Sequence, residues 1–273
     1  MRALNTTTAT TAQPQTTTPG APTTLPAALL LDMDDTILAD SEGLKEAYRL
    51  VYERFADRFA PASVAALTAA KDEYNQWYWS DPERHRLGRL DLNGARQIIL
   101  AESLRRLGVF DGAGEAATGM RAALAKEMAS AYGELRLASS RPLPGAIEAL
   151  ARLRAGGMRL ALITNGAASA QRRKIELHQL APYFEVVIVE GEFGLGKPDP
   201  RVYQHALATL QLAPQQVWMV GDNLEWEVAA PQRLGIHGVW MDLAGVGLPP
   251  DSSIHPDHII HSLTELVEAL GLA

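Results

Sequence analysis

The sequence of 273 residues predicts an α/β fold, in which a doubly wound parallel sheet is interrupted by an inserted all-α domain. Three observations lead to this prediction. Short apolar runs recur along the chain, amphipathic helical patterns separate most of them, and one long stretch after the first run carries helical patterns alone. Alternation of strands and helices is typical of parallel sheets, because parallel neighbours need a long crossover connection.

Six apolar runs predict the strands. The first, Ala-Leu-Leu-Leu-Asp at 28–32, follows Pro26 and stops at acidic residues, which is typical of a strand buried on both faces. The later runs lie at 159–164, 186–190, 217–220, 238–242 and, more weakly, 258–261. Amphipathic helices with a 3.6-residue period are predicted at 146–155, 168–180, 200–212 and 225–234. A Rossmann-like core built from residues 26–37 and 141–273 follows from this order.

Residues 38–140 read as a series of amphipathic helices without a strand-like run of comparable strength. This inserted helical domain leaves the core after the first strand and returns before the second. We therefore expect it to lie above the carboxyl ends of the strands, which is the edge where such sheets bind ligands. Residues 1–25 are rich in Thr and Pro and poor in large apolar side chains, so we expect a disordered tail.

The composition excludes several classes of function. The net charge of −7 and the absence of a long basic run argue against nucleic acid and anionic membranes as partners. No apolar run approaches the roughly 20 residues that span a bilayer. The chain has no cysteine, which excludes disulfides and thiolate catalysis and fits a cytoplasmic protein. The oligomeric state stays unknown at this stage.

Polar residues follow four of the predicted strands. Asp32 and Asp34 follow the first, the run Thr164-Asn165-Gly166 follows the second, and Lys197 and Asp222 follow the next two. A solvated acidic turn would explain the first two acids taken alone about equally well. The predicted topology, however, brings all four strand ends to one edge of the sheet.

The sequence resembles the haloacid dehalogenase-like phosphatase superfamily in four ordered motifs. These are D-x-D-x-T at 32–36, a threonine after an apolar strand at 164, G-K-P-D-P at 196–200 and G-D-N-x-x-x-E at 221–227. The match extends over nearly everything from Leu29 onward, and the inserted segment resembles the helical cap of that family. Four motifs in the correct order at strand ends are far more specific than any one of them.

The resemblance implies a Mg²⁺-dependent hydrolysis of a small-molecule phosphate ester. Asp32 would be the nucleophile that forms a phospho-aspartyl intermediate, and Asp34 would protonate the leaving alcohol and then activate water. Asp32, the backbone carbonyl of Asp34 and Asp222 would hold Mg²⁺, a set of oxygen donors that suits this ion. The phosphate would be bound by Thr164, Asn165, Gly166 and Lys197.

Two further assignments are less direct. Glu227 stands where the family more commonly has aspartate, so we expect it to orient Lys197 or a metal-bound water rather than to bind the metal. In the inserted domain, Arg84 and Arg86 follow the aromatic run 77–79 and are candidates for substrate recognition. The alternative is that the aromatics pack between helices while the cations are solvated.

Three other functions compete with the phosphatase. A phosphomutase shares all four motifs, and a 2-haloacid dehalogenase also uses an aspartate nucleophile. In dehalogenases of this family the second acid is replaced, so Asp34 favours phosphate chemistry. The third alternative is a non-catalytic binding module that retains the fold. The sequence does not indicate which phosphate ester is the substrate.

Overall fold

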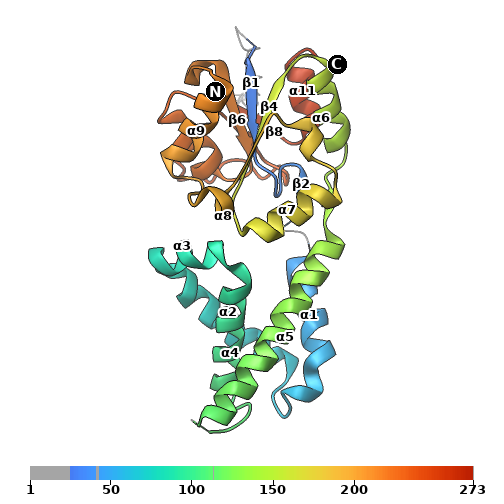
Figure 1. Cartoon of the computed structure of the whole chain (residues 1–273), viewed down its shortest axis with the longest axis vertical. Coiled ribbons are helices and arrows are strands. Elements are labelled where there is room, and N and C mark those ends of the chain that lie inside the picture. Colours follow the sequence, from blue (N-terminus) through green and yellow to red (C-terminus); the bar gives the residue numbers. More distant parts are fainter. Residues whose placement is uncertain (1–24, 41–42, 113, 273) are drawn as a thin grey trace, which may run out of the picture.

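The computed structural model describes residues 25–40, 43–112 and 114–272. The disordered tail expected at residues 1–25 lies outside these residues apart from Leu25. Figure 1 shows two parts, a sheet covered by helices and an elongated helical region attached to one edge of it. Within the described residues, no helix is both long and apolar enough to cross a membrane.

Six parallel strands form the main sheet in the order β5-β4-β1-β6-β7-β8. Their bounds are Ala28–Leu31 (β1), Arg159–Thr164 (β4), Val186–Val189 (β5), Val217–Gly221 (β6), His237–Met241 (β7) and His258–Ile260 (β8). Strand β1 is central, and its last residue, Leu31, lies opposite Leu162 and Val220. The predicted doubly wound parallel sheet is confirmed.

Helices cover both faces of this sheet, which explains why β1 is apolar at every position. Leu29 and Leu31 pack with helices α6 (Ala146–Ala155) and α11 (Leu263–Ala269) on one face. Leu30 points to the other face, where helix α9 (Pro200–Leu210) packs. All four β1 side chains are fully buried, as expected of the middle strand of a three-layer structure.

The inserted region has a separate apolar core. Its helices are α1 (Leu44–Phe55), α2 (Val64–Ser80), α3 (Pro82–Leu90), α4 (Leu92–Arg106) and α5 (Glu115–Ser139), with the short 3₁₀ helix η1 (Ala56–Arg58) after α1. Side chains from four of the helices, among them Tyr52, Leu67, Leu104 and Met128, are fully buried against one another. Ser63, Asp81 and Asp91 cap α2, α3 and α4 by accepting from main-chain amides.

Two elements differ from the prediction. Two short antiparallel strands, β2 (Leu38–Ala39) and β3 (Arg141–Pro142), pair at the ends of the insertion, and neither was predicted. β2 lies at the start of the segment expected to be helical, and β3 lies directly after that segment. Two residues are too few to produce a periodic signal. The helix expected at 225–234 is instead a π-helix, η4 (Leu224–Ala229), followed by the short helix α10 (Ala230–Gln232). Pro231 lacks an amide hydrogen and interrupts the regular helical bonding.

The remaining helical elements lie in connections of the core. They comprise α7 (Ala168–Leu177), the 3₁₀ turns η2 (Ala181–Tyr183) and η3 (Pro214–Gln216), and the single turn α8 (Glu190–Phe193). Helix α7 ends three residues earlier than predicted, and Gln179 then adopts a left-handed backbone with φ of 51°. Helix α7 follows β4 directly, so its amino-terminal half lies beside the site described next.

Candidate active site

The chain turns sharply out of the sheet after β1 and places Asp32 and Asp34 at the same edge of the sheet. The amide of Asp32 still donates to the carbonyl of Val220 at 2.9 Å, which continues the pairing with β6. The carbonyl of the buried Met33 then accepts from the amides of Ile37 and Leu38, both at 2.9 Å. This compact loop fixes where Asp32 and Asp34 leave the sheet.

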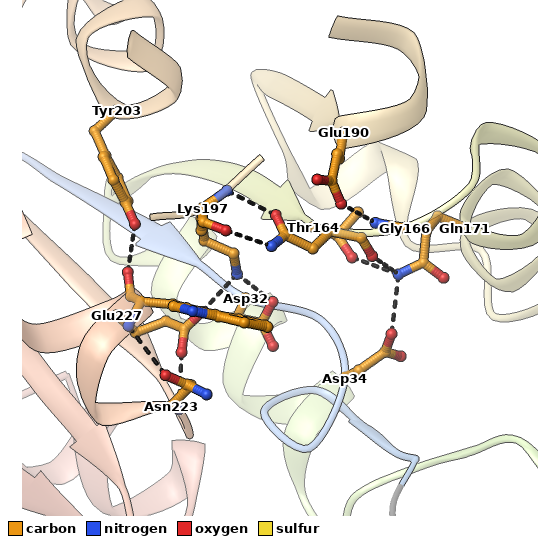
Figure 2. Close-up of polar contacts among 12 residues, drawn as sticks. Asp32, Asp34, Thr164, Gly166, Gln171, Glu190, Lys197, Tyr203, Asn223 and Glu227 are labelled. Atoms are coloured by element: carbon orange, nitrogen blue, oxygen red, sulfur yellow. Dashed lines mark hydrogen bonds and ion pairs between the residues drawn. The ribbon is translucent and has the colours of Figure 1, made fainter. Parts of the chain in front are cut away.

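Asp32, Lys197 and Glu227 form a buried charged cluster (Figure 2). Lys197 Nζ lies 2.5 Å from Asp32 Oδ1 and 2.7 Å from Glu227 Oε1. The side chains of Lys197 and Glu227 are both 1% exposed. Burial raises the pKa of Asp32, Lys197 opposes this and Glu227 adds to it, so that the pKa is about 6. Asp32 is therefore ionised at neutral pH despite its burial.

Neighbouring residues hold both the side chain and the main chain of Lys197. Burial alone would lower its pKa, but Asp32 and Glu227 together raise it, so the ammonium group stays charged. At the main chain, the Asn165 side chain donates to the Lys197 carbonyl at 2.7 Å and accepts from the Lys197 amide at 2.8 Å. The Asn165 amide group thus fixes the loop that carries the lysine.

Thr164 and Asp34 are joined by Gln171, which is 4% exposed on α7. Gln171 Nε2 lies 2.6 Å from Thr164 Oγ1 and 2.9 Å from Asp34 Oδ2, and also 2.8 Å from the Asn165 carbonyl. The other oxygen of Asp34 accepts from Lys174 Nζ at 2.7 Å. Burial raises the pKa of Asp34, Lys174 opposes it, and the neighbouring Asp40 and Asp32 raise it further.

Gly166, predicted to contact phosphate, already has a partner for its amide. This amide donates to Glu190 Oε2 at 2.9 Å, and Glu190 is 3% exposed. A φ of 123° at Gly166 is a conformation that favours glycine. Phosphate binding by this amide would therefore have to compete with Glu190.

Arg89 connects the helical region to the same loops. Its guanidinium lies 3.2 Å from Glu190 Oε1 and donates to the Lys197 carbonyl at 3.1 Å. Arg84 instead donates to the Trp77 and Tyr78 carbonyls and stacks on Trp77, with the guanidinium carbon 3.8 Å from the ring centre.

Arg86 pairs with the exposed Glu83 at 2.7 Å on the outside of α3. The contacts described for Arg84 and Arg86 thus lie within the helical region, and their role in substrate recognition stays a prediction. Arg89, from the same basic run, is the cation whose described contacts reach the core.

Asp222 follows β6 and faces the opening of the site. Although this side chain is exposed on one side, partial burial and the carboxylates of Asp32, Glu227 and Asp35 raise its pKa. The next residue, Asn223, donates its amide to Glu227 Oε2 at 2.8 Å and caps η4 through its side chain. Glu227 thus bridges Lys197 and the loop that carries Asp222.

The charge balance of the site fits a divalent cation. Asp32, Glu227 and Asp35 all act on Asp222, Glu227 also acts on Asp32, and Lys197 opposes these effects. Among the described residues, no three His, Cys, Asp or Glu side chains converge as a metal centre. Two carboxylates, Asp32 and Asp222, with the Asp34 carbonyl are nevertheless a suitable set for Mg²⁺, which keeps several water or substrate oxygens as ligands. The donor set therefore fits the predicted ion.

A cavity of about 760 Å³ opens beside Asp222 at the carboxyl ends of β6, β7 and β8. Asp35, Thr36, Trp240 and Asp242 are among its lining residues. Ligands thus have room to approach this edge of the sheet.

Sequence reasoning missed Gln171, Lys174 and Glu190 and gave Arg89 no role. A signal existed for the first two, since they lie three residues apart on the helix that follows the Thr-Asn-Gly run and therefore share a helix face. Glu190 and Arg89 carry no such signal. They come together only through the packing of the helical region against the core.

Comparison with known proteins identifies the family of this chain. Residues 26–235 match the family model described as haloacid dehalogenase-like hydrolase. Phosphoserine phosphatase from Thermus thermophilus is 34% identical over 252 residues, which cover 89% of this chain and 99% of that protein. The chain belongs to the haloacid dehalogenase-like hydrolases, and the predicted superfamily and hydrolase class are confirmed.

Two solved structures share the fold. A 2-haloacid dehalogenase from Pseudomonas syringae is 24% identical with a TM-score of 0.64, covering 90% of this chain and 99% of that one. The hydrolase YfnB from Bacillus subtilis, solved bound to magnesium, is 21% identical with a TM-score of 0.66 and the same coverage. Both dehalogenases and other hydrolases are therefore built on this scaffold, and the site must decide between them.

Proposed function

We propose that this hydrolase is a Mg²⁺-dependent phosphatase that acts on a small-molecule phosphomonoester through a phospho-aspartyl intermediate on Asp32. The observation that carries the proposal is that Asp32 and Asp34 have different hydrogen-bonding partners. Asp32 is fixed by Lys197 in the core, and Asp34 is linked to Thr164 by Gln171. A nucleophile, an acid–base group and a hydroxyl donor thus belong to one connected site.

In the first step, Asp32 attacks the phosphorus atom and the bond from phosphorus to the ester oxygen breaks. Asp34 gives its proton to that oxygen, which leaves as an alcohol. The raised pKa of Asp34 favours the protonated form that this step needs. Lys197 and the Thr164 hydroxyl neutralise charge on the phosphoryl oxygens, which is the main requirement of phosphoryl transfer.

In the second step, water attacks the phosphorus atom of the phospho-aspartyl group. Asp34, now ionised, accepts a proton from this water, and the bond from phosphorus to the Asp32 oxygen breaks. Phosphate leaves and both carboxyl groups return to their starting states. Bound by Asp32, Asp222 and the Asp34 carbonyl, Mg²⁺ would supply positive charge against which an anionic nucleophile can approach an anionic substrate.

The site does not favour the alternative function, that of a dehalogenase. Displacement of halide from carbon needs no proton donor, whereas Asp34 is held at hydrogen-bonding distance by two side chains of α7. A relative that is 34% identical over nearly the full length is a phosphoserine phosphatase, so O-phosphoserine is the first substrate to test. A net charge of −7 and the absence of cysteine support a small-molecule substrate and a cytoplasmic location.

The proposal is tested by phosphate release from a panel of phosphomonoesters that includes O-phosphoserine. We expect the wild type to release phosphate with Mg²⁺ and not with EDTA, and Asp32→Asn to be inactive. A parallel assay with 2-chloropropionate measures halide release. Halide release without Mg²⁺, or full phosphatase activity of Asp32→Asn, would overturn the proposal.

A further inference from the structure

Lys174 lies between the acid–base candidate and the connection to the helical region. Its Nζ atom is 2.7 Å from Asp34 Oδ1 and 2.8 Å from Asp40 Oδ1. The lysine side chain is 14% exposed, so little water screens these two ion pairs. The pKa of Lys174 is raised, because the two carboxylates outweigh the opposing effect of burial.

Asp40 lies in the first linker, directly after β2, and a cation from the second linker reaches it as well. Arg136, in the last turn of α5, lies 2.8 Å from Asp40 Oδ1 through its Nη2 atom. The amide of Asp40 also donates to Asp35 Oδ1 at 2.8 Å. Asp40 is therefore tied to the loop after β1, to the end of α5 and to α7 of the core.

These contacts form a continuous chain that runs from Arg136 through Asp40 to Lys174, whose ammonium group reaches Asp34. It joins the place where α5 meets the core in Figure 1 to the residue that would move protons. The mechanism proposed above assigns no role to Lys174 or Asp40. Lys174 contacts both the site, through Asp34, and the linker, through Asp40.

We propose that Lys174 is a positioning residue that, through Asp40, holds the Asp34 carboxyl group in a fixed place relative to the linkers of the helical region. This inference rests on the proposed phosphatase function. Gln171 binds one oxygen of Asp34 and Lys174 binds the other, so together they restrict its rotation. Misplacement of a catalytic group by about 1 Å can cost roughly 100-fold in rate.

The test compares two substrates that differ in their need for a proton donor. When the bond from phosphorus to the ester oxygen breaks, O-phosphoserine releases serine, whose oxygen would leave as an unstable alkoxide unless it is protonated. p-Nitrophenyl phosphate releases p-nitrophenolate, which is a stable anion. The value of kcat/KM includes only steps up to departure of this group. If Lys174 acts through Asp34, Lys174→Met should lower kcat/KM about 10- to 100-fold for O-phosphoserine and much less for p-nitrophenyl phosphate.

A double-mutant cycle separates positioning from general damage. In an Asp34→Asn background there is no acid left to position, so adding Lys174→Met should cause no further loss. Asp40→Asn keeps the lysine but weakens its anchor, and should give the same substrate-dependent pattern with a smaller loss. Arg172→Met is the matched control, because Arg172 lies on the same helix and pairs with the exposed Glu192 instead. Its activity should match the wild type.

Equal losses on both substrates, or losses that add in the double mutant, would show that Lys174 only supports the fold and would overturn the inference. Unchanged activity of Lys174→Met would do the same. If Lys174→Met does not fold, Asp40→Asn provides the comparison of the two substrates. Equal losses of activity on both substrates in that variant would also contradict the inference. Phosphate release by the wild type and its loss in Asp32→Asn test the phosphatase function independently of Lys174. Failure of this inference and failure of the proposed function therefore give different results.

Discussion

Asp32 and Asp34 lie two residues apart, yet their surroundings differ in kind. Asp32 shares with Glu227 a single lysine that is 1% exposed within the core. Asp34 is more accessible, at 27% side-chain exposure, and both of its partners come from one face of α7. The first arrangement pairs a buried carboxylate with a lysine and keeps it stationary, as a nucleophile requires. The second holds a carboxyl group between Gln171 and Lys174, beside the linkers of the helical region. Burial raises the pKa of both acids. The difference shows how one loop provides two chemically distinct acids.

The largest effect is expected from Lys197→Met, which removes the cation from the Asp32 cluster. Two carboxylates would remain buried without a neutralising cation, which costs about 3–5 kcal/mol in the free energy of unfolding. Activity should fall by roughly 10³-fold, because charge on the phosphoryl group is no longer neutralised. Thermal unfolding and phosphate release measure both effects. Lys126→Met, an exposed lysine of α5, is the control, and equal stability of the two variants would contradict the account.

Asp34→Asn should separate activity from stability. The asparagine oxygen can still accept hydrogen bonds, but proton transfer is lost, which lowers kcat by roughly 10²- to 10⁴-fold. We expect a much smaller change in melting temperature than for Lys197→Met, because Asp34 is less buried and keeps polar partners. A variant with normal kcat on O-phosphoserine would show that Asp34 is not the acid–base group.

Glu227→Gln tests the electrostatic coupling inside the Asp32 cluster. The negative charge of Glu227 raises the pKa of Asp32, so its removal should lower that pKa. The acidic limb of the kcat/KM profile, recorded with saturating Mg²⁺, should then move to lower pH. A profile that moves to higher pH would mean that Glu227 does not act on Asp32 in this way.

The smallest expected effect is the pH dependence of the protein's stability in the absence of metal. In the folded protein the pKa values of Asp32, at about 6, and of Asp34 and Asp222 are raised above their ordinary values near 4. The folded state therefore binds protons more tightly than the unfolded one. The resulting stabilisation of the folded state is complete below about pH 4. It is lost as pH rises through the pKa values of these groups in the folded protein.

Melting temperatures in EDTA should accordingly decrease from pH 5 to pH 8, in steps that scanning calorimetry can resolve. Mg²⁺ bound by two of these carboxylates, Asp32 and Asp222, would neutralise them and should raise the melting temperature more at pH 8 than at pH 5. An equal Mg²⁺ effect at both pH values would contradict the proposed grouping of these acids around the metal.

The sheet could be predicted from sequence because its strands are buried on both faces and therefore form continuous apolar runs. The core motifs were predictable for a related reason, since each follows a strand end and parallel strands bring those ends together. β2 and β3 could not be predicted, as two-residue strands have no period.

The surroundings of Asp34 illustrate a second limit. Residues 171–174 read Gln-Arg-Arg-Lys, and although Lys174 shares a helix face with Gln171, the run does not show which face points toward Asp34 and which toward Glu192. The helix phase selects among these cations only once the neighbouring elements are in place. Arg89 similarly reaches the Lys197 loop across 108 positions of sequence, which local patterns do not encode.

The most direct test of the central claim is to trap the phosphorylated enzyme. The enzyme is mixed with Mg²⁺ and O-phosphoserine, quenched rapidly in acid, digested and analysed by mass spectrometry. The account predicts one added phosphoryl group on the peptide that contains Asp32, and none in Asp32→Asn. A phosphoryl group on another residue, or sustained phosphate release by Asp32→Asn, would contradict it.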